Sequence, residues 1–239
     1  VKMCEAFSEL RNEVVLITTN VSKNKENIFN FYNVKFKFIF KKLKSFKKFP
    51  LGINYYLFSF FSVIESFKYK PDLYITRNFF TCFLLVLFRK KVIMELHHDL
   101  KIESRIVQFL TPRFKFLNSK FVNKIVAITN GVKEEYVKKN IINEDKIIVL
   151  PSGSSIKTRF NFSKDKKNFK IGYFGSLYRS RGLDLIIKLA KIDKKNHYYM
   201  FGDLSKIKNL KYKYVANNIH LNDYISYKQI PKKLMQMDI

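Results

Sequence analysis

The chain has 239 residues, of which 47% are hydrophobic and 16% aromatic, a composition that excludes a disordered protein and allows one large or two small cores. Two cysteines exclude a disulfide framework and suit a reducing compartment, in which Cys4 and Cys82 would be packing residues. The formal net charge of +27 leaves three interpretations open: a nucleic-acid partner, an anionic membrane surface, or a lysine-rich composition with no partner.

Short apolar strands alternate with helices along residues 1–150. A helix is expected at 3–10, and strands are expected at 13–18, 71–77, 91–97, 124–129 and 146–150. Helices are expected at 78–88, 103–118 and 131–140. The apolar stretches 55–64 and 79–88 are about half the ~20 residues of a membrane span, so we expect buried helices and no transmembrane segment. The alternation predicts a parallel, doubly wound α/β sheet.

The segment 35–49 is basic and aromatic, and residues 23–70 contain eleven lysines and two glutamates. Its apolar side chains recur at helical spacing and are Phe36, Ile39, Phe40, Leu43 and Phe46. This composition predicts a helix lying in an anionic membrane interface, with a core helix that has a lysine-rich outer face as the alternative. Single-stranded nucleic acid would also suit interleaved aromatic and basic residues, but no nucleic-acid motif accompanies them, so we expect no such partner.

The composition of the sequence changes at residues 151–168, which are rich in Ser, Lys and Asn, a composition typical of a linker. A second α/β segment follows, with strands expected at 169–174, 197–201 and near 219, and helices at 183–191, 204–213 and 228–236. We therefore expect a first domain at 1–150 and a second at 169–239, the latter too short for a complete doubly wound domain.

A glycine-bearing loop occupies residues 172–183, where a strand runs into a turn and a helix begins after Arg179 and Arg181. Backbone N–H groups at a helix N-terminus, with guanidinium groups beside them, suit a diphosphate. Glycine lets the backbone approach such a ligand closely. The alternative is an ordinary strand-to-helix turn with a solvated basic rim.

A polar cluster at residues 95–99 (Glu-Leu-His-His-Asp) ends the expected strand 91–97. In open α/β sheets this edge is where ligands bind, and a histidine there could orient a hydroxyl or share a proton with nearby carboxylates. A solvated loop is the alternative. We expect no metal site, because consecutive histidines rarely direct both rings at one ion and no third ligand follows at useful spacing.

Four stretches, in this order, resemble the retaining GT-B glycosyltransferases called group 1 or family four. Residues 125–134 resemble the strand and helix that close the family's N-terminal domain, and 146–153 resemble its entry to the interdomain linker. Residues 171–185 are similar to the opening of its C-terminal domain, and 218–239 to the segment that follows later in that domain. The resemblance extends from about residue 71 to the end of the sequence.

The resemblance implies two Rossmann-like domains that transfer a sugar from a nucleotide-diphosphate donor to a glycan or lipid-linked acceptor with retention, in cell-envelope polysaccharide or lipopolysaccharide biosynthesis. It implies no cofactor and no required metal. Together with the lack of a recognisable signal peptide, it predicts a cytoplasmic protein, peripheral on the inner face of the membrane. The family's first glycine-rich loop and its paired-glutamate motif fall outside residues 1–239, so we expect this stretch alone to lack complete activity.

The resemblance also implies roles for particular residues on the donor side. Gly175 would allow the diphosphate to approach, and Arg181 takes the usual basic position before a glycine. Ser176 stands where the family commonly has a second basic residue, and Arg179 would supply the positive charge that Ser176 lacks. The nucleotide base and ribose would be contacted by Gly202, Tyr224 and Ile225.

On the acceptor side, the resemblance favours His97 over His98 as the catalytic polar residue, with Glu95 as its orienting partner. Arg77, at the end of the preceding strand, and His98 would line the acceptor side of the cleft. Two alternatives to a transferase stay open. One is a GT-B sugar-nucleotide epimerase, and the other is a non-enzymatic basic module that binds an anionic membrane or nucleic acid.

Overall fold

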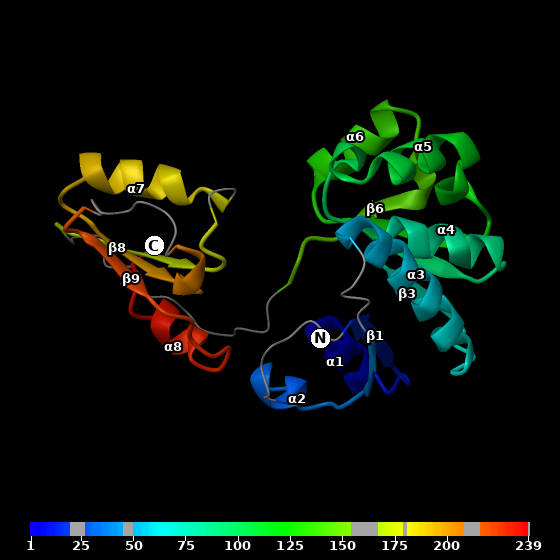
Figure 1. The fold of residues 1–239 in the computed structure, drawn as a ribbon, viewed down its shortest axis with the longest axis horizontal. Coiled ribbons are helices and arrows are strands. Elements are labelled where there is room, and N and C mark those ends of the chain that lie inside the picture. Colours follow the sequence, from blue (N-terminus) through cyan, green and yellow to red (C-terminus); the bar gives the residue numbers. More distant parts are fainter. Residues whose placement is uncertain (20–26, 45–49, 154–166, 179–180, 208–215, 239) are drawn as a thin grey trace. The chain divides into compact units, whose positions relative to one another are not determined.

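The structure is a computed structural model that describes residues 1–19, 27–44, 50–153, 167–178, 181–207 and 216–238 (Figure 1). The chain divides into two compact units, which are described separately. The first comprises Val1, Met3–Lys25 and Phe36–Ser154, and the second comprises Lys2, Glu26–Lys35 and Ser155–Ile239. Among the described residues, no helix combines the length and the apolar composition that crossing a bilayer would need.

Two parallel sheets form the first unit. Strand β1 (Val15–Thr19) pairs with β2 (Ile39–Leu43), with Val15 opposite Ile39. The second sheet has the order β3 (Tyr74–Thr76), β4 (Val92–Leu96), β5 (Val122–Ala127) and β6 (Ile147–Val149). All of these pairs are parallel, so the predicted parallel α/β architecture is confirmed.

Helices connect the strands of the first unit, and polar side chains define where several of them begin. The helices are α1 (Lys2–Glu9), α3 (Leu51–Phe67), α4 (Phe79–Leu87), α5 (Arg105–Phe114) and α6 (Asn130–Lys138), with the short 3₁₀ turns η1 (Leu100–Ile102), η2 (Phe116–Asn118) and η3 (Glu144–Lys146). Asn78 Oδ1 accepts from Thr81 N at 2.8 Å to cap α4, and Thr129 Oγ1 accepts from Val132 N at 3.2 Å to cap α6.

The core of the first unit lies between the four-stranded sheet and its helices. Fully buried members include Leu85 of α4, Met94 of β4 and Ile125 of β5. Cys82 belongs to this core, and burial raises the pKa of its thiol to about 12. Both cysteines are free and buried, as expected for packing residues.

The predicted helix at 35–49 is wrong, because residues 39–43 form strand β2. Residues 45–49, including Phe46, lie outside the described part. Ile39 N donates to Val14 O at 2.9 Å, which starts the parallel ladder with β1. Aromatic and β-branched residues favour such a pleated surface, and they also fit a helical repeat over a short window. The membrane-interface helix inferred from this segment therefore does not exist.

The expectation that two apolar helices are buried holds for α4 except at its end, where Leu87 and Phe88 are exposed, and it is wrong for the outer face of α3. Phe79, Cys82 and Leu85 of α4 are buried. In α3, Phe60 and Phe61 are exposed instead, while Ser62 is buried and donates to Ser59 O at 2.9 Å. A buried serine can donate a hydrogen bond to the preceding helical turn, so a serine can lie on the inner face of α3. The positions of the polar residues therefore did not predict which face is exposed.

The second unit is built on a three-stranded parallel sheet. Its order is β7 (Lys170–Phe174), β8 (His197–Phe201) and β9 (Ile219–Asn222). The helices are α2 (Ile28–Phe31), α7 (Leu183–Ile192) and α8 (Ile230–Leu234), with the short turn η5 (Leu204–Lys206). Of the helix expected at 204–213, η5 and Ile207 are described. Residues 208–213, and residues 154–166 of the expected linker, lie outside the described part.

Asn218 fastens the end of α7 to the sheet of the second unit. Its Nδ2 donates to Ala190 O at 3.0 Å, to Asp193 O at 2.8 Å and to Asn196 O at 2.8 Å. The Asp193 carboxylate in turn accepts from Tyr198 Oη at 2.8 Å. Burial and this carboxylate raise the pKa of Tyr198 to about 12. These bonds connect the last turn of α7 to the beginning of β8 and β9.

We expect Asn218→Ala to lower the free energy of unfolding by about 2 kcal/mol, because it leaves buried carbonyl groups without a donor. The measurement is urea unfolding followed by circular dichroism. Asn222→Ala is the matched control, since Asn222 Nδ2 makes one bond to a carbonyl, that of His220 at 3.0 Å. Equal losses in the two variants would contradict the fastening role of Asn218.

Candidate functional site

The carboxyl ends of β3 and β4 bring three predicted residues together. Arg77 follows β3, and Glu95 lies on the neighbouring strand β4, where the buried residues Met94 and Leu96 flank it and face the core. Arg77 Nε and Nη2 donate to Glu95 Oε2 and Oε1 at 2.8 and 3.1 Å, forming a two-bond fork. His97 Nε2 lies 2.9 Å from Glu95 Oε1. We call Arg77, Glu95 and His97 the acid–histidine cluster.

Two opposing influences act on the ionisation of Glu95. Burial is the largest single influence and raises its pKa, but the hydrogen bonds and charges of Arg77 and His97 together outweigh it and hold the pKa below its ordinary value. An ionised carboxylate only accepts hydrogen bonds, so the proton between the two side chains belongs to His97 Nε2. In the neutral ring, His97 Nδ1 is then the nitrogen with a lone pair, able to accept a proton or a hydrogen bond.

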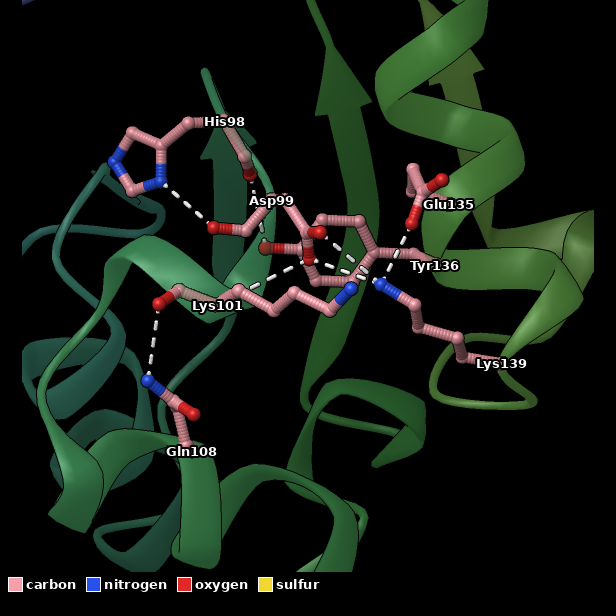
Figure 2. A network of polar contacts seen from close by, with 7 residues as sticks. All are labelled: His98, Asp99, Lys101, Gln108, Glu135, Tyr136 and Lys139. Carbon is pink, nitrogen blue, oxygen red and sulfur yellow. Dashed lines mark hydrogen bonds and ion pairs between the residues drawn. The ribbon is translucent and has the colours of Figure 1, made fainter.

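His98 belongs to a second group of polar contacts, the turn network, drawn in Figure 2 with residues of α5 and α6. Its Nδ1 lies 3.2 Å from Asp99 O, and its carbonyl oxygen accepts from Tyr136 Oη at 3.1 Å. The other ring nitrogen, Nε2, lies 3.5 Å from Glu103 Oε1. Burial raises the pKa of Glu103, and the opposing influence of His98 does not cancel it.

Asp99 is the acceptor at the centre of the turn network. Lys139 Nζ, from the end of α6, lies 3.1 Å from Asp99 Oδ2 and 2.6 Å from Glu135 Oε2. The Lys101 amide donates to Asp99 Oδ1 at 3.2 Å, so the same carboxylate caps η1. Burial opposes the ionisation of Asp99, but the bond from Lys139 and the bond from the Lys101 amide prevail and lower its pKa. The turn after β4 is therefore held at two points by α6.

Sequence reasoning missed Glu103, Tyr136 and Lys139. Tyr136 is buried, and its ring stacks with that of Phe79 at a centroid distance of 6.4 Å. It lies 38 residues from His98 in the chain, so only the fold reveals the contact. For Glu103 the sequence gives only one weak signal, an acidic residue a few positions after a histidine pair.

The two histidines have different carboxylate partners, Glu95 for His97 and Glu103 for His98. Within the part of the chain that the structure describes, no three side chains of the metal-ligating types converge on one point. The expectation of a metal-independent site stays a prediction.

In the second unit, the glycine loop runs from β7 to α7. Gly175 N donates to Phe201 O at 3.0 Å, and Tyr173 Oη donates to Ser176 O at 3.0 Å. Leu177 is buried and anchors the loop, while Ser176 and Arg181 are exposed. Gly182 precedes α7 with a φ of 79°, a left-handed conformation that favours glycine. Arg179 lies outside the described residues.

Gly202 packs directly against the glycine loop. A Cβ at Gly202 would collide with the carbonyl oxygen of Gly175 and come within 2.8 Å of Leu177 Cγ. By contrast, the three atoms nearest to a Cβ at Gly175 would all belong to the Tyr173 side chain, the closest at 3.2 Å. The two glycines that the sequence places on the donor side are therefore neighbours, and the packing of the loop requires a glycine at position 202.

The other residues predicted to contact the nucleotide follow β9. Tyr224 is exposed, and its ring stacks with that of Phe31 at a centroid distance of 6.1 Å, while Ile225 is half-buried. The acid–histidine cluster belongs to the first unit, and Gly175, Gly202 and Tyr224 belong to the second.

Comparison with known proteins adds a family and a fold. The profile of Glycosyltransferase Family 4 matches residues 1–156. HepE from Anabaena, solved with UDP and glucose, superposes with a TM-score of 0.69 at 14% identity, covering 99% of this chain and 68% of HepE. A glycosyltransferase from Rickettsia africae gives a TM-score of 0.61 at 17% identity, covering 97% of this chain and 65% of that protein.

A protein assigned as a UDP-N-acetylglucosamine 2-epimerase from Listeria monocytogenes gives a TM-score of 0.57 at 12% identity, covering 96% of this chain and 67% of that protein. Comparison with curated protein sequences gave no match. At these identities the structures show the shared GT-B fold, and the chain spans about two thirds of their length.

We expect Gly202→Ala to lower the free energy of unfolding by about 2 kcal/mol, because the new methyl group displaces the Gly175 backbone. Gly175→Ala should change it by about 1 kcal/mol or less, since the Tyr173 side chain can move aside. Urea unfolding measures both. A larger loss for Gly175→Ala than for Gly202→Ala would contradict the packing described here.

Glu95→Gln should reduce stability at neutral pH and reduce it less in acid. The folded state lowers the pKa of Glu95 below 4.5, so its carboxylate stabilises the fold above that pH and loses the effect as the pH falls. The stability difference between wild type and variant, from urea unfolding, should shrink below pH 4.5. Glu134→Gln, in the exposed pair with Lys138, is the control and should change little at any pH.

Proposed function

Because this chain belongs to glycosyltransferase family 4, we propose that it takes part in transferring a hexosyl group from a nucleotide-diphosphate sugar, with retention, to a glycan or lipid-linked acceptor. The observation that carries the proposal is the glycine loop of the second unit. In it, Gly175 is exposed and carries no side chain, α7 begins without a side-chain cap, and the exposed Arg181 lies one residue before Gly182.

A diphosphate suits that loop for electrostatic reasons. The first N–H groups of a helix carry a partial positive charge and have no partner within the helix, so an anion there is stabilised. A guanidinium group adds a full charge and can donate two parallel bonds to phosphate oxygens. In the transfer, the bond between the anomeric carbon and the diphosphate oxygen breaks, and the leaving diphosphate keeps the electron pair. Positive groups at the loop stabilise that leaving group.

The acid–histidine cluster suits the acceptor side of the same reaction. The new bond forms between the anomeric carbon and an acceptor oxygen, and the proton of that hydroxyl passes to an oxygen of the leaving diphosphate. His97 Nδ1, with Nε2 occupied by Glu95, can accept a hydrogen bond from that hydroxyl and orient it. Arg77 keeps Glu95 ionised and thereby keeps the proton on Nε2. We assign His97 the catalytic position and Glu95 the orienting one.

The proposal extends to cell-envelope polysaccharide or lipopolysaccharide synthesis at the inner face of the cytoplasmic membrane. Its support is the net charge of +27, which attracts a chain both to anionic donors and to anionic lipid surfaces. In the segment 35–49 the lysines and the exposed Phe36 and Ile39 remain part of this proposal, on and beside strand β2 instead of on a helix.

The donor is tested with the full-length protein and a panel of uridine, guanosine and adenosine diphosphate sugars, read by thermal unfolding. One donor should stabilise selectively, by about 3 kcal/mol at a hundredfold excess over its Kd. Arg181→Ala should abolish the shift without changing the unfolding of the free protein.

Lys188→Ala is the matched control, because Lys188 is another exposed cation, on the middle of α7. It removes the same charge but should leave the donor-induced shift intact. Indifference to all donors, or equal losses in Arg181→Ala and Lys188→Ala, would overturn the proposed donor site.

A further inference from the structure

Helix α5 presents an apolar outer surface that its position in the fold does not explain. Val107 and Thr111 face the core and are buried, as the inner face of a surface helix should be. The opposite face would then ordinarily be polar. Instead Ile106 is 52% exposed and Phe109 is 63% exposed, and Ile102, three residues before α5 begins, is 72% exposed.

Cations frame these apolar side chains. Arg105, Phe109 and Arg113 are spaced four residues apart, so they form one row along the outer face of the helix. Lys101 lies just before α5 and Lys115 just after it, and both are exposed. We call Ile102, Ile106, Phe109, Arg105, Arg113, Lys101 and Lys115 the α5 face.

The acidic residues next to the α5 face in the sequence, Asp99 and Glu103, both face other side chains: Lys139 lies against Asp99, and His98 lies against Glu103. Between residues 100 and 133 the sequence contains seven Lys or Arg residues and a single acidic residue, Glu103. The Glu103 side chain is mostly buried and directed at His98. A ligand that approached the α5 face would therefore meet apolar side chains and positive charge together.

We propose that the α5 face is a membrane-docking surface that binds anionic lipid. Isoleucine and phenylalanine can enter the boundary between headgroups and acyl chains, while arginine extends its apolar stem and keeps its guanidinium at the lipid phosphates. A second copy of this chain is a poor occupant, because two molecules of net charge +27 repel each other. Nucleic acid would use the cations but gains nothing from exposed isoleucines.

Helix α7 of the second unit also exposes apolar residues, so such residues alone do not identify a membrane-docking helix. It exposes Leu185, Leu189 and Ile192, with Lys188 and Lys191 beside them. However, α7 carries Asp184 in its first turn, has no arginine and has no aromatic side chain. Of these two helices, α5 alone combines arginines with an aromatic ring and has no acidic residue, which makes α7 a natural control.

The α5 face is joined directly to the turn network. Gln108 of α5 donates to Lys101 O at 3.1 Å (Figure 2) and to Glu103 O at 2.7 Å, and Glu103 contacts His98. A lipid headgroup at the start of α5 would therefore lie close to the predicted acceptor side. This step rests on the proposed function and favours a lipid-linked acceptor, whereas the docking surface itself does not depend on it.

The test is co-sedimentation of the full-length protein with phosphatidylcholine vesicles containing about 30% phosphatidylglycerol. The double variants Ile106→Ser/Phe109→Ser and Arg105→Gln/Arg113→Gln should each lower the partition coefficient about tenfold or more. Both change exposed residues, so the thermal unfolding midpoint should stay that of the wild type, and this is measured alongside.

The matched controls on α7 are Leu185→Ser/Leu189→Ser and Lys188→Gln/Lys191→Gln, which remove equal numbers of apolar and charged side chains. They should leave vesicle binding within about twofold of wild type. Equal losses from α5 and α7 variants would show that overall charge and apolarity govern binding, and would overturn the proposal. So would α5 variants that lose binding to a single-stranded oligonucleotide while vesicle binding persists.

The donor and vesicle experiments can contradict the transferase function and the docking surface independently of each other. A protein that binds vesicles through α5 but is stabilised by none of the nucleotide sugars would keep the docking surface and lose the transferase. A protein that binds a nucleotide sugar but binds vesicles no better than its α5 variants do would keep the transferase and lose the docking surface.

Discussion

Parallel pairing of strands is the constraint on which the other features depend. Every strand of the β3–β6 sheet and of the β7–β9 sheet points the same way as its neighbours, so the turns that leave the strands gather at one edge of each sheet. In the first unit that edge holds Arg77, Glu95 and His97. In the second it holds Gly175 and Gly202 in contact. The parallel pairing of the strands brings these residues into contact, because closeness in the sequence alone would not.

A local concentration of acidic side chains stands out in a chain of strongly positive charge. Glu95, Asp99 and Glu103 fall within nine residues, although the whole chain has only 19 acidic residues. Each lies against a histidine or a cation, and none is left alone in the low-dielectric interior. Tyr136 and Lys139 of helix α6 bond to His98 O and to Asp99, so the turn that carries the histidines is held in place. A fixed turn can orient a substrate group.

The elements that could be predicted are those with a local signal. The alternation of short apolar strands and helices along the sequence located β3 to β9 and α4 to α7. Strand β2 could not be predicted, because Ile39–Leu43 satisfies a helical repeat equally well and its partner β1 lies more than twenty residues away. The exposure of the outer face of α3 could not be predicted for a related reason, since a buried serine cannot be told from an exposed one in the sequence.

The candidate site divides in the same way. Residues at strand ends, such as His97 and Gly175, could be selected because the edge of a parallel sheet is a known place for ligands. The fork between Arg77 and Glu95, the contact of Glu103 with His98 and the bond from Tyr136 need the folded chain, because each joins residues on different elements. The collision of a Gly202 side chain with Gly175 likewise depends on how two loops pack, and no spacing in the sequence encodes it.

The most direct test of the account is turnover by the full-length protein, supplied with nucleotide sugars and a membrane lipid extract. We expect release of a nucleoside diphosphate from one donor only when the extract is present, with the sugar recovered on an extracted lipid or glycan and its anomeric configuration retained. Conversion of a UDP-sugar to its C2 epimer without the extract would instead identify an epimerase. Either that result or no turnover of any donor would contradict the transferase assignment.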